Sequence, residues 1–155
     1  MTGAEAMREA IALAIENVKN GGGPFGCVIL RAGKVVGRGV NRVTATNDPT
    51  AHAEVVAVRA ACQALGTFEL RGCEVYTSCE PCPMCLAACF WARVDAVHFA
   101  GTRDQAAAAG FSDAELYDEI PRPLEQRRLK ISPLLASDGQ RPFDAWAAQA
   151  NKTPY

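Results

Sequence analysis

The chain has 155 residues, which fits a single domain with one good hydrophobic core and no need of disulfides. It carries 16 Lys and Arg against 17 Asp and Glu, so its formal net charge is −1 with the histidines neutral. This balance argues against a nucleic-acid partner, because binding to a phosphate backbone is driven by clustered cations.

The composition also argues against secretion and membrane insertion. Charged residues interrupt the first twenty positions, and no apolar run is long enough to span a bilayer. The seven cysteines are an odd number, which in a reducing compartment indicates metal ligation and buried thiols rather than a disulfide framework. We therefore expect a cytoplasmic protein with no membrane partner.

The first third of the chain predicts a helix followed by a hairpin. One apolar helical face is marked by Met7, Ile11, Ile15 and Val18, and the helix ends at the glycine run 21–23. Two short β-rich runs, Cys27 to Leu30 and Val35 to Val40, flank a turn at residues 32–34 and predict an antiparallel hairpin. The polar segment from Thr44 to Thr50 is expected to be irregular.

The middle of the chain alternates helices and strands. A helical pattern runs from Ala51 to Leu65, with Thr50 or Asp48 available to cap its start. A strand follows at residues 73–77, and then Pro81 at the start of an apolar helix that runs from Cys82 to Ala92.

The last third is expected to add two strands and two helical segments. They are a strand at 94–100, a partly helical stretch at 116–128 broken at two prolines, a strand candidate at 129–135 and a helix at 142–150. Mixed elements with crossover helices predict a three-layer α/β/α fold, in which helices cover both faces of a mixed sheet of about five strands. We expect residues 1–155 to form one domain.

One sequence motif predicts the chemistry of this protein. His52-Ala53-Glu54 is followed, after residues 55–80, by Pro81-Cys82-Pro83-Met84-Cys85. One imidazole and two thiolates suffice for a catalytic zinc with an open position, and a glutamate that is not a ligand can move the protons of a bound water. This motif is the known signature of zinc-dependent nucleobase deaminases.

Helix geometry restricts how the residues of this motif can be arranged. Residues two apart on a helix point about 200° away from each other, so His52 and Glu54 converge only if His52 lies in a loosely wound first turn. Cys82 and Cys85 share a face at a helix N-terminus, where the positive end of the dipole favours thiolates. The alternative is a closed structural zinc site, for which Cys79 is the nearest fourth ligand.

Longer matches make the resemblance specific. Segments 47–54 (NDPTAHAE), 77–85 (TSCEPCPMC), 90–93 (FWAR), 109–117 (AGFSDAELY) and 143–155 (FDAWAAQANKTPY) together resemble the bacterial guanine deaminases of the cytidine-deaminase-like superfamily. The stretch GFSD at 110–113 and the tail at 151–155 are the discriminating parts. The tRNA adenosine deaminases share the zinc motif but resemble this chain poorly from about residue 101 onward.

The resemblance implies a role for particular residues. It implies a zinc ion held by His52, Cys82 and Cys85, with Glu54 as the proton shuttle. The residues that it places around the substrate are Phe25, Asn41, Ala53, Trp91, Asp113 and Tyr155. It also implies a homodimer in which the C-terminal segment, about 136–155, exchanges between subunits and closes over the partner's active site.

These substrate positions also have plain structural readings. Asn41 can satisfy a strand end, Asp113 can cap the following helix in competition with Ser112, and Phe25 and Trp91 can be core aromatics. Tyr155 can belong to ordinary packing of the tail.

The expected reaction is hydrolytic deamination of guanine to xanthine and ammonia, a step of purine catabolism. Zinc makes hydroxide available near neutral pH for attack on C2, and Glu54 transfers the protons. The metal motif alone leaves guanosine, cytosine or an aminotriazine as substrates, because selectivity lies in the pocket. A tRNA adenosine deaminase and a structural zinc module are further alternatives.

Overall fold

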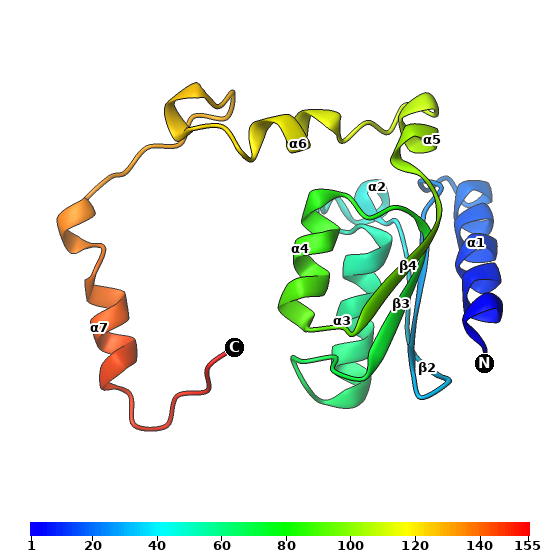
Figure 1. Ribbon diagram of the computed structural model, residues 1–155, viewed down its shortest axis with the longest axis horizontal. Coiled ribbons are helices and arrows are strands. Elements are labelled where there is room, and N and C mark those ends of the chain that lie inside the picture. The colour runs from blue at the N-terminus through cyan, green and yellow to red at the C-terminus, as the bar shows by residue number, and fades with distance from the viewer. The chain divides into compact units, whose positions relative to one another are not determined.

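The computed structural model describes residues 1–155 and divides them into two compact units, Met1–Asp113 and Ala114–Tyr155. The first unit holds the sheet and the whole zinc motif (Figure 1). Its elements are α1 (Gly3–Lys19), β1 (Gly26–Arg31), β2 (Lys34–Val40), α2 (Val43–Thr46), α3 (Ala53–Leu65), β3 (Cys73–Cys79), α4 (Pro83–Ala92), β4 (Ala96–Gly101) and α5 (Arg103–Ala108).

The sheet of the first unit is mixed and has four strands in the order β2-β1-β3-β4. β1 pairs antiparallel with both β2 and β3, and β3 pairs parallel with β4. The predicted hairpin is confirmed, and its turn places Ala32 and Gly33 at φ of 49° and 72°, as a tight two-residue hairpin turn requires. The parallel pair needs a crossover connection, which α4 supplies.

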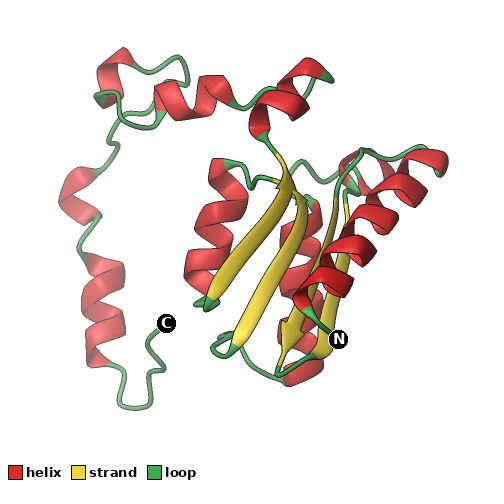
Figure 2. Ribbon diagram, turned by 45° about the vertical axis from the view of Figure 1, so that its right-hand side comes forward, coloured by secondary structure: helices red, strands yellow, loops and turns green.

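Helices cover both faces of this sheet, which confirms the three-layer α/β/α prediction (Figure 2). One apolar cluster joins α1 to the side chains of Val28, Leu30 and Tyr76. The other cluster lies between α3, α4 and the opposite side chains of the same strands, Cys27, Ile29 and Val75 among them. The alternation along β1 and β3 therefore divides the core into two layers.

The face that α1 presents to the sheet corrects the prediction from apolar spacing. Its buried residues are Ala6, Ala10 and Ala14, whereas Ile15 is 55% exposed. Only small side chains fit, because a Cβ at Gly26 of β1 would lie 2.3 Å from the Ala10 carbonyl oxygen. The expected helix is present, but close backbone approach rather than side-chain size decides its buried face.

α3 approaches β2 in the same way. A Cβ at Gly37 would lie 2.5 Å from the Ala57 carbonyl oxygen, and a Cβ at Gly39 would lie 2.1 Å from the Ala53 carbonyl oxygen. Ala53, Ala57 and Ala61 are fully buried along this contact. The two glycines of β2 therefore set how closely the helix that carries Glu54 lies on the sheet.

The second unit contains no strand. Its elements are α6 (Ala114–Glu119), the 3-10 turns Leu124–Gln126 and Ala136–Asp138, and α7 (Arg141–Ala148). The predicted helices are present, but the strand expected at 129–135 is wrong, and the sheet has four strands instead of about five. A strand needs a neighbour for its backbone groups, and within this unit no other strand offers one.

Two shorter features also differ from the sequence prediction. The segment expected to be irregular at 44–50 begins with the one-turn helix α2, and its Thr46 hydroxyl donates to the Arg42 carbonyl. α5 was not predicted, although Thr102 and Gln105 form a capping box at its start. No helix has both the length and the apolar character that crossing a membrane requires.

Candidate active site

His52 and Glu54 lie at the start of α3. His52 is the N-cap residue with extended dihedrals, φ −69° and ψ 157°, and Glu54 is the second residue of the helix. His52 therefore stands outside the regular helix, so the opposed directions of residues two apart do not apply. His52 and Glu54 can therefore point to the same site, as the sequence analysis required.

The loop before His52 is held by its own polar groups. The Asp48 carboxylate accepts hydrogen bonds from the Thr50 backbone N–H at 2.8 Å and from its hydroxyl at 2.6 Å, and Arg59 pairs with Asp48 from α3. The His52 N–H donates to the Thr50 carbonyl at 2.8 Å. Neither Asp48 nor Thr50 caps α3 as expected, because both side chains are used within the loop that orients the histidine.

Cys82 and Cys85 lie at the start of α4. Cys82 is the N-cap residue, and its Sγ accepts a hydrogen bond from the Cys85 N–H at 3.5 Å. Pro83, rather than the expected Pro81, occupies the first helical position, where its missing N–H costs nothing. Both sulfur atoms therefore lie at the positive end of the helix dipole, which favours the thiolate form.

The two helix starts bring the three predicted zinc ligands together. His52 Nδ1 lies 3.5 Å from Cys82 Sγ and 3.4 Å from Cys85 Sγ. Tetrahedral zinc with Zn–S of about 2.3 Å and Zn–N of about 2.0 Å places its sulfur and nitrogen ligands about 3.5 Å apart. The donor atoms thus fit zinc(II), with Nδ1 as the ligating nitrogen of the imidazole.

No fourth side chain joins this cluster, whose ligand atoms lie within 4.8 Å of one another. Cys79, the candidate for a closed structural site, directs its thiol to the Thr102 carbonyl at 3.8 Å instead. A zinc site with three protein ligands keeps one position for water or substrate, which is the arrangement of catalytic rather than structural zinc.

Hydrogen bonds among the three metal-ligating residues shift their pKa values. Hydrogen bonding with Cys85 lowers the pKa of the Cys82 thiol to about 4, and the same contact raises the pKa of Cys85. Hydrogen bonding with Cys82 raises the pKa of His52. Both cysteines ligate a metal ion in the thiolate form, so metal binding releases protons from this cluster.

Glu54 is buried beside this cluster and is 6% exposed. Burial raises the pKa of its carboxyl group, because the charged form loses solvation. A carboxyl group with a raised pKa suits a residue that accepts and returns a proton near neutral pH. The Thr77 hydroxyl donates to Glu54 Oε1 at 3.3 Å.

Phe25, Asn41 and Ala53 have defined places in the first unit. The rings of Phe25 and Phe111 meet edge to face with centroids 5.1 Å apart. Asn41 follows β2, where its Oδ1 accepts a hydrogen bond from the Val43 N–H at 3.2 Å. Ala53, the first residue of α3, is fully buried. The strand-end reading of Asn41 is therefore correct for Oδ1, and its Nδ2 donates no hydrogen bond within the described residues.

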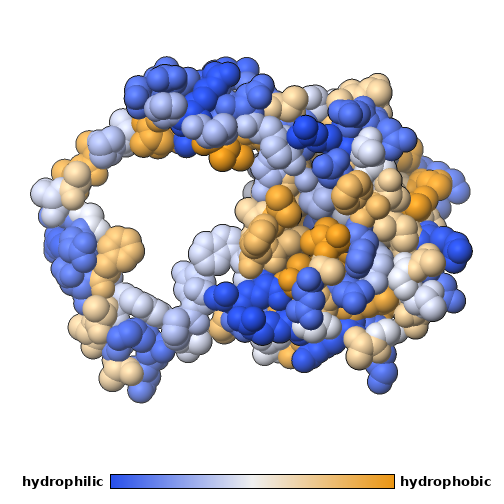
Figure 3. Space-filling model, in the orientation of Figure 1, coloured by the Kyte–Doolittle hydropathy of each residue, from blue (hydrophilic) through white to orange (hydrophobic).

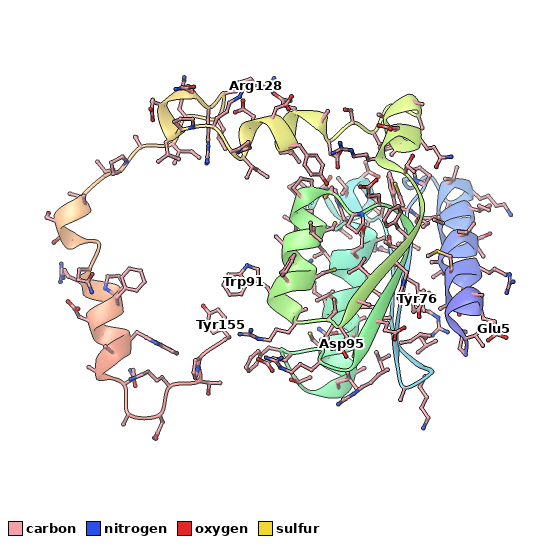
Figure 4. All side chains as sticks on the ribbon, viewed as in Figure 1. Glu5, Tyr76, Trp91, Asp95, Arg128 and Tyr155 are labelled. Carbon is pink, nitrogen blue, oxygen red and sulfur yellow. The ribbon has the colours of Figure 1, made fainter.

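Trp91 and Asp113 belong to the first unit, and Tyr155 belongs to the second. Trp91 is 67% exposed and extends from α4 away from the sheet (Figure 4), six residues or about 9 Å along the helix axis beyond Cys85. Asp113 is the last residue of the first unit, and Tyr155 ends the second. Their substrate roles stay predictions.

Thr77 and Phe111 are the residues of this region that the sequence reasoning missed. Thr77 occupies an inward position of β3, on the same face as Val75, where a polar residue among apolar neighbours was a visible signal. Phe111 stands in the discriminating stretch 110–113, but no spacing rule connects it with Phe25. Only the folded chain shows that contact.

A three-layer α/β/α fold with an open His/Cys/Cys zinc site and a buried, unligating glutamate defines the class of zinc-dependent deaminases. The chain belongs to the cytidine and deoxycytidylate deaminase zinc-binding family, whose zinc-binding region it matches over residues 2–101. Zinc is accordingly the metal of His52, Cys82 and Cys85.

Individual relatives match different shares of the chain. It is 49% identical over 150 residues to the guanine deaminase of Bacillus subtilis (strain 168), with 96% of each chain covered. An X-ray structure of guanine deaminase from Bacillus subtilis matches with a TM-score of 0.97 and 47% identity, covering 100% of this chain and 99% of that one. The tRNA-specific adenosine deaminase of Agrobacterium fabrum is 38% identical over 96 residues, 62% of each chain.

Proposed function

We propose that this chain is a zinc-dependent guanine deaminase that hydrolyses guanine to xanthine and ammonia. The observation that carries the proposal is the open three-ligand zinc site beside the buried carboxyl group of Glu54. Similarity to a guanine deaminase along 96% of both chains supports guanine as the substrate, whereas the match to a tRNA adenosine deaminase covers 62%.

The chain's own residues divide the chemical work. His52 and the two cysteines hold the zinc ion, which when bound acidifies a water molecule and so makes a nucleophile available at neutral pH. Glu54 takes one proton of this water and passes it to the ring nitrogen beside C2, so that C2 becomes electrophilic and forms a bond to the water oxygen. Glu54 then takes the second proton from that oxygen and gives it to the exocyclic amine, the C–N bond breaks, and the nitrogen leaves as ammonia.

Selection of the base is assigned to the residues around this centre. The Phe25 ring, supported edge-on by Phe111, offers an apolar wall for a planar base. The Asn41 side chain keeps an amide N–H to donate to an acceptor on the purine edge. We include Ala53, Trp91, Asp113 and Tyr155 as further substrate-binding residues on the strength of the family resemblance.

We also propose that the protein acts as a homodimer in which the segment from about 136 to 155 exchanges between subunits. Apolar side chains lie on the surface of both units (Figure 3), with Phe90 of α4 75% exposed and Phe143 of α7 66% exposed. No residue of α6 or α7 is buried. Exposed apolar surface of this extent supports contact with a second subunit. Light scattering during size-exclusion chromatography measures the molecular mass and so tests the dimer.

The decisive assay measures ammonia release from guanine, guanosine, cytosine, adenine and an aminotriazine by the zinc-loaded protein. Guanine is expected to be the preferred substrate, and removal of zinc by a chelator is expected to abolish turnover. Turnover of cytosine or a nucleoside without guanine would contradict the substrate and leave the chemistry standing. Tightly held zinc with no ammonia from any base would favour a structural zinc module.

Glu54→Gln isolates the proton-transfer role. The amide keeps the shape of the side chain but cannot exchange protons, so kcat should fall by a factor of about 100 to 10,000 while zinc content stays at wild type. Glu69→Gln is a matched control, because Glu69 pairs only with surface arginines, Arg71 and Arg93. Ammonia release by Glu54→Gln at close to the wild-type rate would remove Glu54 from the mechanism.

A further inference from the structure

The two buried polar or charged residues of the described chain are hydrogen-bonded to each other. Glu54 is 6% exposed, Thr77 is 1% exposed, and the Thr77 hydroxyl donates to Glu54 Oε1 at 3.3 Å. They come from different elements, the first turn of α3 and the middle of β3. The contact is therefore made by the tertiary fold and not by either element alone.

Packing does not account for a threonine at this position. Side chains alternate along β3, and the inward positions before Thr77 are Cys73 and Val75, both fully buried in the apolar cluster under α3 and α4. Valine has almost the same shape as threonine and would fill the same space without a hydroxyl to satisfy. The hydroxyl has a partner, and that partner is the Glu54 carboxyl group.

Thr77 fixes one oxygen of the carboxyl group, because its hydroxyl donates to Oε1. A proton shuttle has to keep a defined direction while it accepts and returns a proton, because small displacements of a reacting group are costly. Thr77 lies on β3, the strand paired with both β1 and β4, so its hydroxyl is fixed by the sheet.

We propose that Thr77 is a positioning residue that anchors one oxygen of Glu54 and so keeps the carboxyl group in a fixed direction for its proton transfers. The proposal rests on the proposed deaminase function, because it assigns Thr77 a role through the proton shuttle. It predicts that the hydroxyl affects the rate of the chemical step rather than the binding of substrate or zinc.

The experiment compares Thr77→Val with Thr77→Ser. Thr77→Val keeps the shape and removes the donor, so kcat should fall about 10- to 100-fold, with KM and zinc content within about twofold of wild type. Thr77→Ser keeps the donor and should retain kcat within about threefold of wild type. Val75→Ala is the matched core control, which should lower the melting temperature without this loss of kcat.

A crystal structure of zinc-loaded Thr77→Val supplies a readout that does not depend on the substrate. The Glu54 carboxyl group should adopt a new or a second conformer there. An unchanged Glu54 conformer, an unchanged kcat, or a Thr77→Ser variant as impaired as Thr77→Val would overturn the proposal. Absence of guanine turnover by the wild-type protein would instead contradict the proposed function, and the Glu54 conformer would still decide the role of Thr77.

Discussion

Substitution of Gly39 by alanine is expected to displace active-site residues, because Gly39 lies on β2 against the first turn of α3. The new Cβ would lie 2.1 Å from the Ala53 carbonyl oxygen, 1.3 Å short of the 3.4 Å at which ordinary contact begins, and 2.6 Å from the Ala57 backbone nitrogen. Both are backbone atoms, so no side chain can rotate away, and the N-terminal turn of α3 has to retreat by about 1 Å.

That turn begins at His52 and carries Glu54, so the displacement moves a zinc ligand and the proton shuttle together. A misplacement of about 1 Å costs about 100-fold in rate, and overpacking lowers the free energy of unfolding by about 1–3 kcal/mol. Ammonia release, zinc content and thermal unfolding are to be measured together on Gly39→Ala.

Gly37→Ala is the matched control for this experiment. A Cβ at Gly37 would meet the Ala57 carbonyl oxygen at 2.5 Å, one turn further from His52. It should destabilise the protein to a similar degree but reduce activity less. Wild-type activity and stability of Gly39→Ala would refute the reasoning from close backbone packing.

Two further predictions concern alkaline stability and the zinc ligands. A hydrogen bond to the Glu74 carboxylate raises the pKa of Tyr76, on the α1 side of β3 (Figure 4), to about 12. The free energy of unfolding should contain this contribution below about pH 10, the pKa of tyrosine in an unfolded chain, and lose it as the pH rises towards 12. In urea unfolding, the stability difference between wild type and Tyr76→Phe should therefore shrink over that range; a constant difference would contradict the assignment. Cys79→Ser should keep one zinc per chain while Cys82→Ser loses it, and metal analysis showing loss of zinc from both would make Cys79 a ligand.

Features set by residues close together in the sequence were predicted more accurately than features set by distant residues. The hairpin at β1 and β2, the helices α3 and α4 and the parallel crossover were predictable, because turn residues and helical spacing are local properties. The exact helix starts were not, since His52 and Cys82 occupy the N-cap positions expected for other residues. The strand expected at 129–135 was wrong, since strand formation depends on a neighbour that local composition does not reveal.

The buried face of α1 shows the same limit. The spacing of Met7, Ile11 and Ile15 is helical and predicts a helix correctly, but it does not say which side meets the sheet. Gly26 brings the β1 backbone so close that only the alanines of α1 fit. Which face is buried was thus decided by a residue on another element, with no side chain of its own.

The sequence by itself determined the chemistry. His52, Glu54, Cys82 and Cys85 are readable because a metal needs particular donor atoms and because each half of the motif is set by the start of one helix. Only the tertiary structure decided that the halves meet with nitrogen and sulfur 3.4 to 3.5 Å apart, that Cys79 points elsewhere and that Thr77 holds Glu54. The physical reason is that these contacts join residues 23 to 33 positions apart, and their geometry depends on strand pairing and on how closely the helices lie on the sheet.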